Sequence, residues 1–427
     1  MAHLRNYLGA IGMLIGNLAY FYIVFGGSNS LPVHVDGTID KKYERVKEVF
    51  EQNFKSGWER DGASLAVYVK GKKVVDLWGG YSDREALKKW KQDTIIMIFS
   101  SSKGVASICI AMLVDRGHLK YDDLVAKHWP EFGQNGKEKI TVQMVMSHQA
   151  GIAYFDDEVT IEEAADHKKI SKKIEKQKPN WIPGTESAYH SITHGWLVDQ
   201  LIRRVDPKKR GIGQFVREEI QEPHKIEIHM GLPKKETVRV ARLYHTGITN
   251  GLRELEASMV DLKNFIAHLW EMRFPHSIAG RAVRNVPWMF GSALTVNDPD
   301  LWHLEQAGVL GMGNARSLAM LYDLVVRKKL ISEKTLALIQ KPVSKIDFGR
   351  RESSIDIGSG FMLTKLNRAG SNQTVGHLGY GCQQSMMDVG NAISIAYTTN
   401  GIKLIMTEGC MTWKKLKNAI YDVFEGK

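Results

Sequence analysis

Residues Phe99–Leu119, FSSSKGVASICIAMLVDRGHL, have the pattern of a buried helix that begins at its first serines. Apolar side chains recur along this stretch at intervals of three and four residues, at Val105, Ile108, Cys109, Met112 and Leu113. Gly117 then gives a stop signal. Ser100 and Lys103 lie one turn apart and share a helix face, so the lysine amine can reach the serine hydroxyl. The S-x-x-K spacing predicts a nucleophile and its base, provided that burial and the positive helix end keep the amine partly neutral.

Taken alone, a motif this short more often marks a polar helix start with a solvated lysine than a catalytic pair. The rest of the chain decides between these two interpretations.

The bulk properties of the chain are those of an ordinary globular protein. Its 427 residues are enough for a large core and, by length, for two or three domains. The net charge of +11 is spread over short clusters such as Lys168–Lys169 and Lys172–Lys173. Most clusters stand among glutamates or at helical spacing, which is typical of solvated faces. We therefore expect no nucleic-acid partner.

The three cysteines, Cys109, Cys382 and Cys410, exclude a dense disulfide framework. They allow one bridge and leave an odd thiol in any case. Cys109 lies on the apolar face of the Ser100 helix, so we expect it to be an inert core residue.

The N-terminus carries an apolar segment. No charged side chain occurs between Tyr7 and Phe25, and this length is about what a bilayer-spanning helix needs. We expect residues 1–26 to form a single-pass membrane anchor, followed by a linker at 27–38. The charges on either side favour a catalytic domain outside the cytoplasm. A cleaved signal peptide, which would give a secreted protein, is the alternative.

The remaining chain alternates between strand and helix patterns in three blocks. Residues 39–54 have the pattern of an amphipathic helix and are followed by a predicted hairpin. Strand patterns return near the C-terminus before a final amphipathic helix at 401–427. The predicted strands are 64–69, 73–78, 360–366, 383–389 and 392–398. We expect an α/β part made of about 39–118 and 355–427, interrupted by a helical insert at about 119–354.

A second candidate side chain, Tyr189, follows the rigid turn Trp181–Gly184, sequence WIPG. Loops held by such turns often carry functional residues. A tyrosine beside an ammonium group has its phenolate favoured and can take a proton from a serine. The alternative is a tyrosine that only packs against the helix after it.

A third candidate segment is Gly376–Gly381, sequence GHLGYG. Its three glycines allow a substrate to approach the backbone closely. A main-chain N–H from this segment, together with that of Ser100, could hold an oxyanion. The alternative is a plain glycine-rich strand with a surface histidine.

Together the three segments resemble the serine β-lactamase-like proteins, a superfamily that includes class C β-lactamases, penicillin-binding DD-peptidases and related esterases. S-x-x-K comes first, then a tyrosine after a W-x-P-G turn, then H-x-G before the last strands. The resemblance runs from about residue 40 to the C-terminus and includes Met146–Gly151 and Trp78–Tyr81. It implies an α/β fold of the β-lactamase/transpeptidase type, with an antiparallel sheet flanked by helices and an inserted all-helical domain.

The resemblance also implies a role for each matching residue. Ser100 matches the acylated nucleophile and Lys103 the lysine that helps to deprotonate it. Tyr189 matches the tyrosine that acts as a base and later protonates the leaving group. His377 and Gly379 match the ends of the K-T-G motif, and the N–H groups of Ser100 and Tyr380 match the oxyanion hole.

Two positions depart from the family pattern. Ser191 stands where class C enzymes have asparagine, which puts contact with an amide side chain of the substrate in doubt. His377 stands in place of a lysine that supports carboxylate recognition, and a histidine is only partly charged at neutral pH. We therefore expect a serine hydrolase acting on a small ester, amide or peptide rather than a resistance β-lactamase.

Other functions have less support in the sequence. G-x-S-x-G, H-E-x-x-H, paired C-x-x-C and Walker A motifs are absent, so we expect no metal and no cofactor. The alternative to an enzyme is a catalytically weak or inactive scaffold that keeps the fold to bind a partner.

Overall fold

The computed structural model describes the chain in segments. They are 31–245, 247, 251, 253–254, 256–257, 276–291, 294–346, 354–368, 371–404 and 410–427. The predicted anchor at 1–26 lies outside these residues. None of the helices that the described segments form has both the length and the apolar character needed to cross a bilayer. Residues 34–427 form one compact unit.

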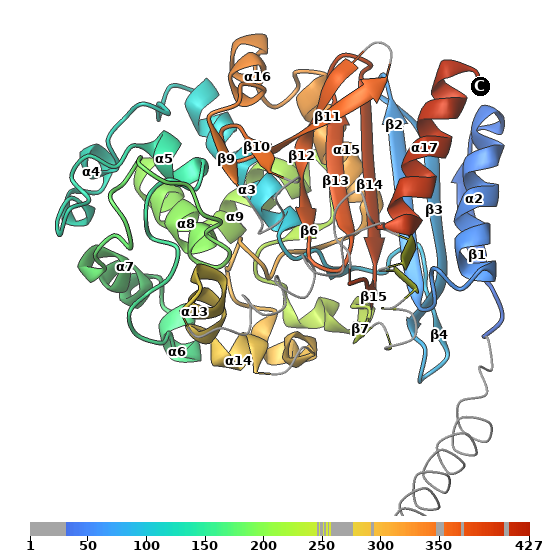
Figure 1. Cartoon of the computed structure of the whole chain (residues 1–427), viewed down its shortest axis with the longest axis horizontal. Coiled ribbons are helices and arrows are strands. Elements are labelled where there is room, and N and C mark those ends of the chain that lie inside the picture. Colours follow the sequence, from blue (N-terminus) through green and yellow to red (C-terminus); the bar gives the residue numbers. More distant parts are fainter. Residues whose placement is uncertain are drawn as a thin grey trace, which may run out of the picture. The chain divides into compact units, whose positions relative to one another are not determined.

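The centre of this unit is an antiparallel sheet of ten strands within the described segments (Figure 1). The strand order is β1 (Val35–Ile39), β3 (Lys72–Asp83), β2 (Gly62–Val69), β14 (Ile393–Thr399), β13 (Gln383–Asp388), β12 (Ser371–Gly379), β11 (Met362–Arg368), β10 (Ile355–Ile357) and β9 (Ser344–Ile346). The short β4 (Lys88–Lys89) pairs with β3. The two ends of the sequence therefore meet where β2 pairs with β14.

The central strands divide their side chains between two cores because successive residues point to opposite faces. On β14, Ile393, Ile395 and Tyr397 join one core, whereas Ala396 joins the other. The first core lies under α2 (Glu44–Lys55) and α17 (Met411–Glu425), which run side by side over the sheet (Figure 1). The second core contains α3 (Ser101–Asp115) and α15 (Ala315–Val326) on the opposite face.

The remaining helices lie mainly between α3 and α15 in the sequence. They are α4 (Val125–His128), α5 (Val142–Met146), α6 (Ile161–Ala165), α7 (His167–Lys176), α8 (Thr193–Val205), α9 (Ile212–Val216), α10 (Glu222–His224), α13 (Ile278–Arg284), α14 (Pro287–Phe290) and α16 (Glu333–Ile339). Short helical turns are η1 (Lys41–Tyr43), η2 (Pro130–Phe132), η3 (Arg217–Gln221), η4 (Lys234–Arg239), η5 (Thr295–Asn297) and η6 (Pro299–Leu301).

The segment expected to be an all-helical insert, 119–354, differs from that expectation. It contributes strands: β6 (Ile228–His229) and β8 (Met312–Gly313) form a small sheet with β5 (Ile96–Met97). Another strand, β7 (Tyr244–His245), pairs with β15 (Gly401–Ile402). Helix α15 packs directly on β14, β2 and β13. The insert therefore shares its core with the sheet because α15 covers that face.

The expected linker at 27–38 is also corrected in part, because Val35–Ile39 forms the edge strand β1. This strand has few apolar residues, so its antiparallel pairing with β3, rather than its own sequence pattern, holds it in the strand conformation. Gly37, at φ +130°, is needed there because a Cβ atom would lie 2.1 Å from the Asp76 carbonyl oxygen.

Candidate active site

Ser100 lies immediately before helix α3, where the chain leaves the short strand β5. The preceding residue, Phe99, has φ +45°, a left-handed conformation that a bulky side chain rarely adopts. Backbone strain of this kind persists only where the surrounding structure imposes it, and it is concentrated at functional sites. The buried Phe99 ring packs edge-on against Tyr380, with 5.5 Å between the ring centroids. This contact joins the Ser100 turn to the end of β12.

The next two serines in the run of three have structural partners. Ser101 Oγ donates a hydrogen bond to the His377 carbonyl at 3.1 Å. Ser102 Oγ donates to the Phe99 carbonyl and accepts from the Gly311 N–H. Ser100 is the one of the three whose hydroxyl contacts Lys103.

Lys103 is fully buried, and uncharged groups surround its amine. Its Nζ lies 3.3 Å from Ser100 Oγ and donates to the carbonyl oxygens of Ser191 and Gly308, both at 2.7 Å. No carboxylate in the described part of the chain forms an ion pair with it. Burial lowers the pKa of Lys103 to about 7, because the charged ammonium loses its hydration. Burial therefore makes the neutral amine accessible near neutral pH. Ser191, which departs from the family pattern, contributes its main chain here.

Tyr189 lies on the loop before α8, and its phenol is hydrogen-bonded to Ser100. The Lys103 amine lies 4.9 Å from the centroid of the tyrosine ring. Burial raises the pKa of the phenol, and the bond to Ser100 only partly opposes this shift. The expectation that a neighbouring ammonium favours the phenolate is therefore wrong, because desolvation of the buried phenolate outweighs the interactions that favour it. Tyr189 is a neutral phenol in this structure.

His377 and Gly379 lie on β12, and the ring of His377 lies 6.2 Å from the ring of Tyr189. His377 is buried, and its Nδ1–H donates to the Leu378 carbonyl at 2.7 Å. Burial and the nearby Lys103 lower the pKa of His377 to about 3. The histidine is thus uncharged at neutral pH, whereas the sequence suggested a partial charge. It offers no cation to a substrate carboxylate.

Gly379 allows β12 to pass against the start of α3. A Cβ atom at this position would lie 2.5 Å from the Ile98 carbonyl oxygen and 3.2 Å from the Ser101 nitrogen. The next residue, Tyr380, has its ring against that of Phe99, the residue that precedes Ser100. Within the described segments, neither the Ser100 nor the Tyr380 N–H donates to a protein acceptor. Two free N–H groups near the Ser100 hydroxyl are the kind of arrangement that can bind an oxyanion.

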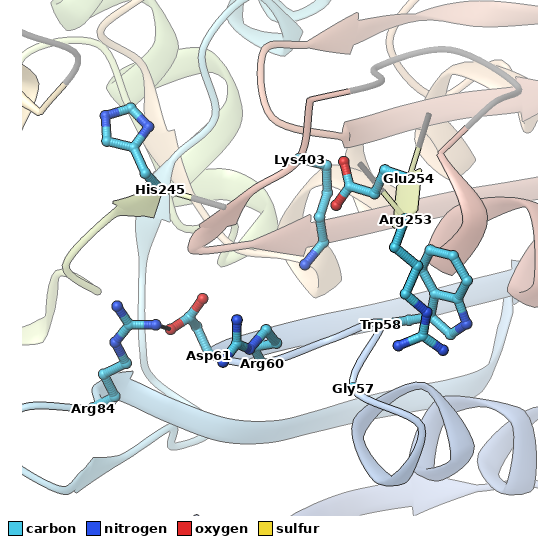
Figure 2. Close-up of a pocket in the computed structure, with 9 residues that line it drawn as sticks. All are labelled: Gly57, Trp58, Arg60, Asp61, Arg84, His245, Arg253, Glu254 and Lys403. Atoms are coloured by element: carbon cyan, nitrogen blue, oxygen red, sulfur yellow. Dashed lines mark hydrogen bonds and ion pairs between the residues drawn. The ribbon is translucent and has the colours of Figure 1, made fainter. Parts of the chain in front are cut away.

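A small cavity lies near the same end of the sheet (Figure 2). Its volume is about 20 Å³, roughly enough for one water molecule. Its lining includes Trp58, Asp61, Arg84, Arg253 and Lys403, and it contains none of the six predicted site residues. Arg84 pairs with Asp61 at 2.7 Å, and the Arg253 guanidinium stacks over the Trp58 ring. Because these charged side chains interact with one another or with an aromatic ring, we do not interpret the cavity as a second site.

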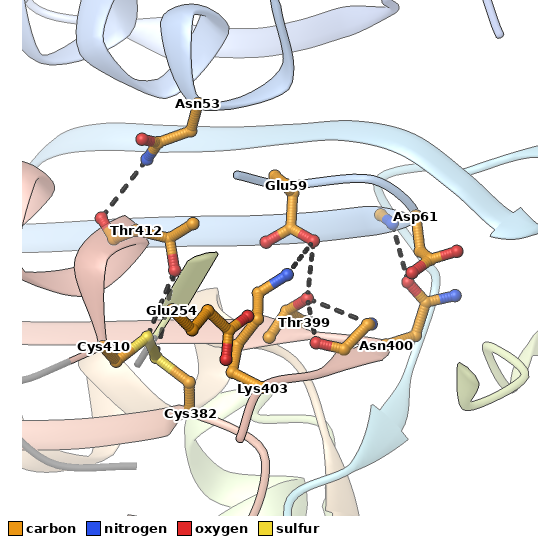
Figure 3. Close-up of polar contacts among 12 residues, drawn as sticks. Asn53, Glu59, Asp61, Glu254, Cys382, Thr399, Asn400, Lys403, Cys410 and Thr412 are labelled. Carbon is orange, nitrogen blue, oxygen red and sulfur yellow. Dashed lines mark hydrogen bonds and ion pairs between the residues drawn. A yellow bond between two sulfur atoms is a disulfide. The ribbon is translucent and has the colours of Figure 1, made fainter. Parts of the chain in front are cut away.

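The turn that carries Tyr380 is linked to neighbouring segments by a disulfide and by Lys403 (Figure 3). The disulfide joins Cys382 to Cys410 at the start of α17, and Cys109 is a buried free thiol. The Lys403 N–H donates to the Gly381 carbonyl, and the Lys403 side chain forms a buried ion pair with Glu59 at 2.9 Å. Sequence reasoning allowed one disulfide without assigning it and missed the Lys403–Glu59 pair.

His148 is a further residue to which the sequence gave no role, although it lies in the Met146–Gly151 segment. Its ring lies 4.8 Å from the ring of Tyr189. The local signal was a histidine beside small residues after a short helix, which does not reveal the distant contact.

The fold and the site together define a protein class: an antiparallel sheet with a Ser-Lys-Tyr cluster where the end of an inner strand, β12, meets helix α3 is the β-lactamase-like arrangement. The Beta-lactamase family model matches residues 50–406, and the chain belongs to this family.

Three relatives show the range of the family around this chain. "Esterase/beta-lactamase LipL" of Mycobacterium tuberculosis is 33% identical over 294 residues, which are 68% of this chain and 64% of that protein. The chain thus spans slightly less than two thirds of this relative. A family VIII carboxylesterase has a TM-score of 0.77 and 26% identity, covering 91% of this chain and 100% of that one. A penicillin-binding protein homologue from Caulobacter crescentus has a TM-score of 0.75 and 29% identity over 91% of this chain and 100% of its own.

Proposed function

We propose that the protein is a serine hydrolase that cleaves small, uncharged esters through an acyl-enzyme on Ser100. One observation carries this proposal: the buried Lys103 amine, with a pKa of about 7, lies against the Ser100 hydroxyl. A general base works best when its pKa is close to the working pH.

The contacts of Lys103 fit a neutral amine that accepts a proton. Such an amine has two N–H groups and one lone pair. The two N–H groups are taken by the Ser191 and Gly308 carbonyls, so the lone pair faces Ser100 Oγ. As the serine oxygen forms its bond to the ester carbonyl carbon, its proton passes to Lys103 Nζ.

The negative charge that develops on the carbonyl oxygen needs donors placed in advance. We assign this role to the N–H groups of Ser100 and Tyr380. When the tetrahedral intermediate collapses, the bond to the leaving alcohol breaks and the alcohol oxygen takes a proton from the Tyr189 phenol. The resulting phenolate then takes a proton directly from the Lys103 ammonium, whose nitrogen lies 4.9 Å from the centroid of the tyrosine ring, because the acylated Ser100 oxygen has no proton to relay. Water then cleaves the acyl-enzyme by the same steps, releasing the acid and restoring the Ser100 hydroxyl.

The uncharged state of His377 favours neutral substrates. A cation at this position would attract a carboxylate, such as that of a β-lactam antibiotic or of a peptide C-terminus. With a pKa of about 3, His377 offers only an uncharged imidazole. The similar structure named as a family VIII carboxylesterase supports an ester substrate, whereas the name of the Mycobacterium tuberculosis relative gives both esterase and beta-lactamase.

A fluorophosphonate probe tests the nucleophile directly. The wild-type protein should gain one probe mass, whereas Ser100→Ala should gain none. Ser101→Ala and Ser102→Ala are matched controls that remove a neighbouring hydroxyl but keep Ser100, and both should still be labelled. Folded protein that several probe classes fail to label would contradict the proposal and favour the alternative, an inactive scaffold.

Turnover of paired substrates tests the specificity. p-Nitrophenyl butyrate should be hydrolysed faster than the chromogenic β-lactam nitrocefin, which carries a carboxylate. The reverse order would contradict the assignment to neutral esters.

A further inference from the structure

His148 occupies an unusual backbone conformation next to the proposed catalytic tyrosine. It lies two residues after α5, is buried, and has φ +61°. The left-handed region is rare for residues other than glycine, although histidine is among the enriched exceptions. Such a conformation persists only where surrounding contacts hold it.

The contacts of His148 include hydrogen bonds to the two residues that flank Tyr189 in the chain, Ala188 and His190. The His148 carbonyl oxygen accepts the Ala188 N–H at 3.2 Å, and its ring Nδ1 accepts the His190 N–H at 3.1 Å. One residue therefore fixes the backbone immediately before and immediately after Tyr189. The His148 ring also packs against the Tyr189 ring, tilted by 48° with 4.8 Å between the centroids.

The hydrogen bond to His190 requires an unprotonated Nδ1, so the ring proton is on Nε2. Burial lowers the pKa of His148 well below its ordinary value, and its surroundings add to this effect. The groups that do so are His194, His190, Lys103 and His377. The imidazole is therefore neutral and keeps its acceptor available.

We propose that His148 is the positioning residue of Tyr189: its carbonyl and its Nδ1 clamp the two residues around the tyrosine, and its ring fixes the phenol against Ser100. This inference rests on the proposed function, in which Tyr189 protonates the leaving alcohol. His148 acts through the tyrosine loop, since its two hydrogen bonds and its ring contact with Tyr189 join it to that loop rather than to Ser100.

The variants separate the clamp from the packing. His148→Leu removes the acceptor at similar side-chain size. His148→Asn keeps an acceptor oxygen where Nδ1 was and tolerates a positive φ. His148→Gly accepts the conformation without strain and removes both acceptor and ring, which covers the case in which the leucine variant does not fold. His194→Leu is the matched control: both nitrogens of this buried histidine lack a partner in the described segments, and its ring lies 4.9 Å from that of His148.

The readout is the dependence of kcat/KM on the leaving group. A p-nitrophenolate needs no proton to depart, whereas an alkoxide does. His148→Leu and His148→Gly should lose about 100-fold on an ethyl ester but less than about tenfold on the p-nitrophenyl ester of the same acid. His148→Asn should recover most of the loss, and His194→Leu should keep wild-type selectivity.

Two results would overturn the proposal. One is an equal loss on both esters, which a general structural role would give. The other is a folded glycine or leucine variant with wild-type kcat/KM. Tyr189→Phe separates this inference from the proposed function: if it shows no leaving-group dependence, the assignment of Tyr189 fails. If Tyr189→Phe shows that dependence and His148→Leu does not, only the role of His148 fails. In the Tyr189→Phe background, His148→Leu should have little further effect, because the two act as one unit.

Discussion

The helical side and the sheet side of Ser100 are held in place by different kinds of interaction. On the helical side, Lys103 and Tyr189 are buried among carbonyls, a hydroxyl and neutral imidazoles. On the sheet side, the turn after β12 is held by the Cys382–Cys410 disulfide and by the buried Lys403–Glu59 ion pair behind it.

The difference follows from what each side is proposed to supply. A carboxylate beside Lys103 would favour the ammonium and raise its pKa, so a base that works near pH 7 needs uncharged partners. The Tyr380 turn supplies only a backbone N–H, which has no pKa to adjust and gains from rigidity. The disulfide and the ion pair therefore stabilise the turn after β12 and do not contact the proposed proton-transfer groups.

Removal of the base should give the largest effect on activity. Lys103→Met is expected to lower kcat/KM by about 10³-fold or more, because general-base catalysis and the contact to Ser100 are both lost. Lys137→Met is a closely matched control. Lys137 is also fully buried and donates to two carbonyls, those of Glu175 and Gln177, but no serine faces it. Ester-hydrolysis kinetics should show its kcat/KM within about twofold of wild type in folded protein; equal losses in both variants would break the comparison.

The second prediction concerns pH. Because the neutral amine is the active form, kcat/KM should fall about tenfold per pH unit below a midpoint near the Lys103 pKa of about 7 and level off above it. His377, with a pKa of about 3, should add no limb between pH 5 and 9. Measured pH–rate profiles with an uncharged ester test this. A midpoint near 10 would mean that Lys103 is charged at neutral pH and that burial does not lower its pKa.

The sequence predicted the helical side of the site better than the sheet side, and the reason is physical. Ser100 and Lys103 are three residues apart on one helix, so helix geometry alone joins them. Tyr189 and His377 meet them only through tertiary contacts, and the family resemblance was needed to connect them. The order of the segments and the fold were predicted in this way, and the family assignment is confirmed.

The sheet side was less predictable because its supports have no local pattern. Strand β12 reads SNQTVGHLG, which is polar and contains two glycines; it forms because β11 and β13 pair with it on both sides. Only its last residues were recognised, within Gly376–Gly381, as a glycine-rich segment that a substrate could approach; the polar residues before them were not predicted to form a strand. Glu59 and Lys403 are 344 residues apart, and each looks like an ordinary surface charge in the sequence.

The third prediction tests the ion pair behind the turn. Lys403→Met leaves the Glu59 carboxylate buried with only hydroxyl partners, which should cost about 3–5 kcal/mol of unfolding free energy. Thermal or chemical denaturation measures this loss. Glu59→Gln combined with Lys403→Met should recover most of the stability because the unpaired charge is gone. A single variant with unchanged stability would show that the pair does not support the sheet side.

The fourth prediction concerns the disulfide, which closes a chain segment of 28 residues. Replacing Cys382 and Cys410 together by alanine should lower the unfolding free energy by about 2–4 kcal/mol. Activity should fall with it, since the turn that carries Tyr380 loses its link to α17. Cys109→Ala, which alters a buried thiol outside any bridge, serves as the control and should leave kcat unchanged. If the double variant keeps full kcat in folded protein, the turn is positioned without the bridge.

The smallest effect is expected from a single methyl group at the junction of the two sides. In Gly379→Ala the new Cβ would meet the Ile98 carbonyl oxygen at 2.5 Å, and a backbone atom has little freedom to move away. Strand β12 should then shift from the start of α3, lowering the unfolding free energy by about 1–3 kcal/mol. Gly247→Ala, where a Cβ meets no atom of the described residues within 4 Å, is the control. Because the shift separates the Ser100 and Tyr380 N–H groups, kcat should fall while KM for a small ester changes little. An increase in KM with unchanged kcat would indicate that the strand contributes to substrate binding rather than to stabilising the oxyanion.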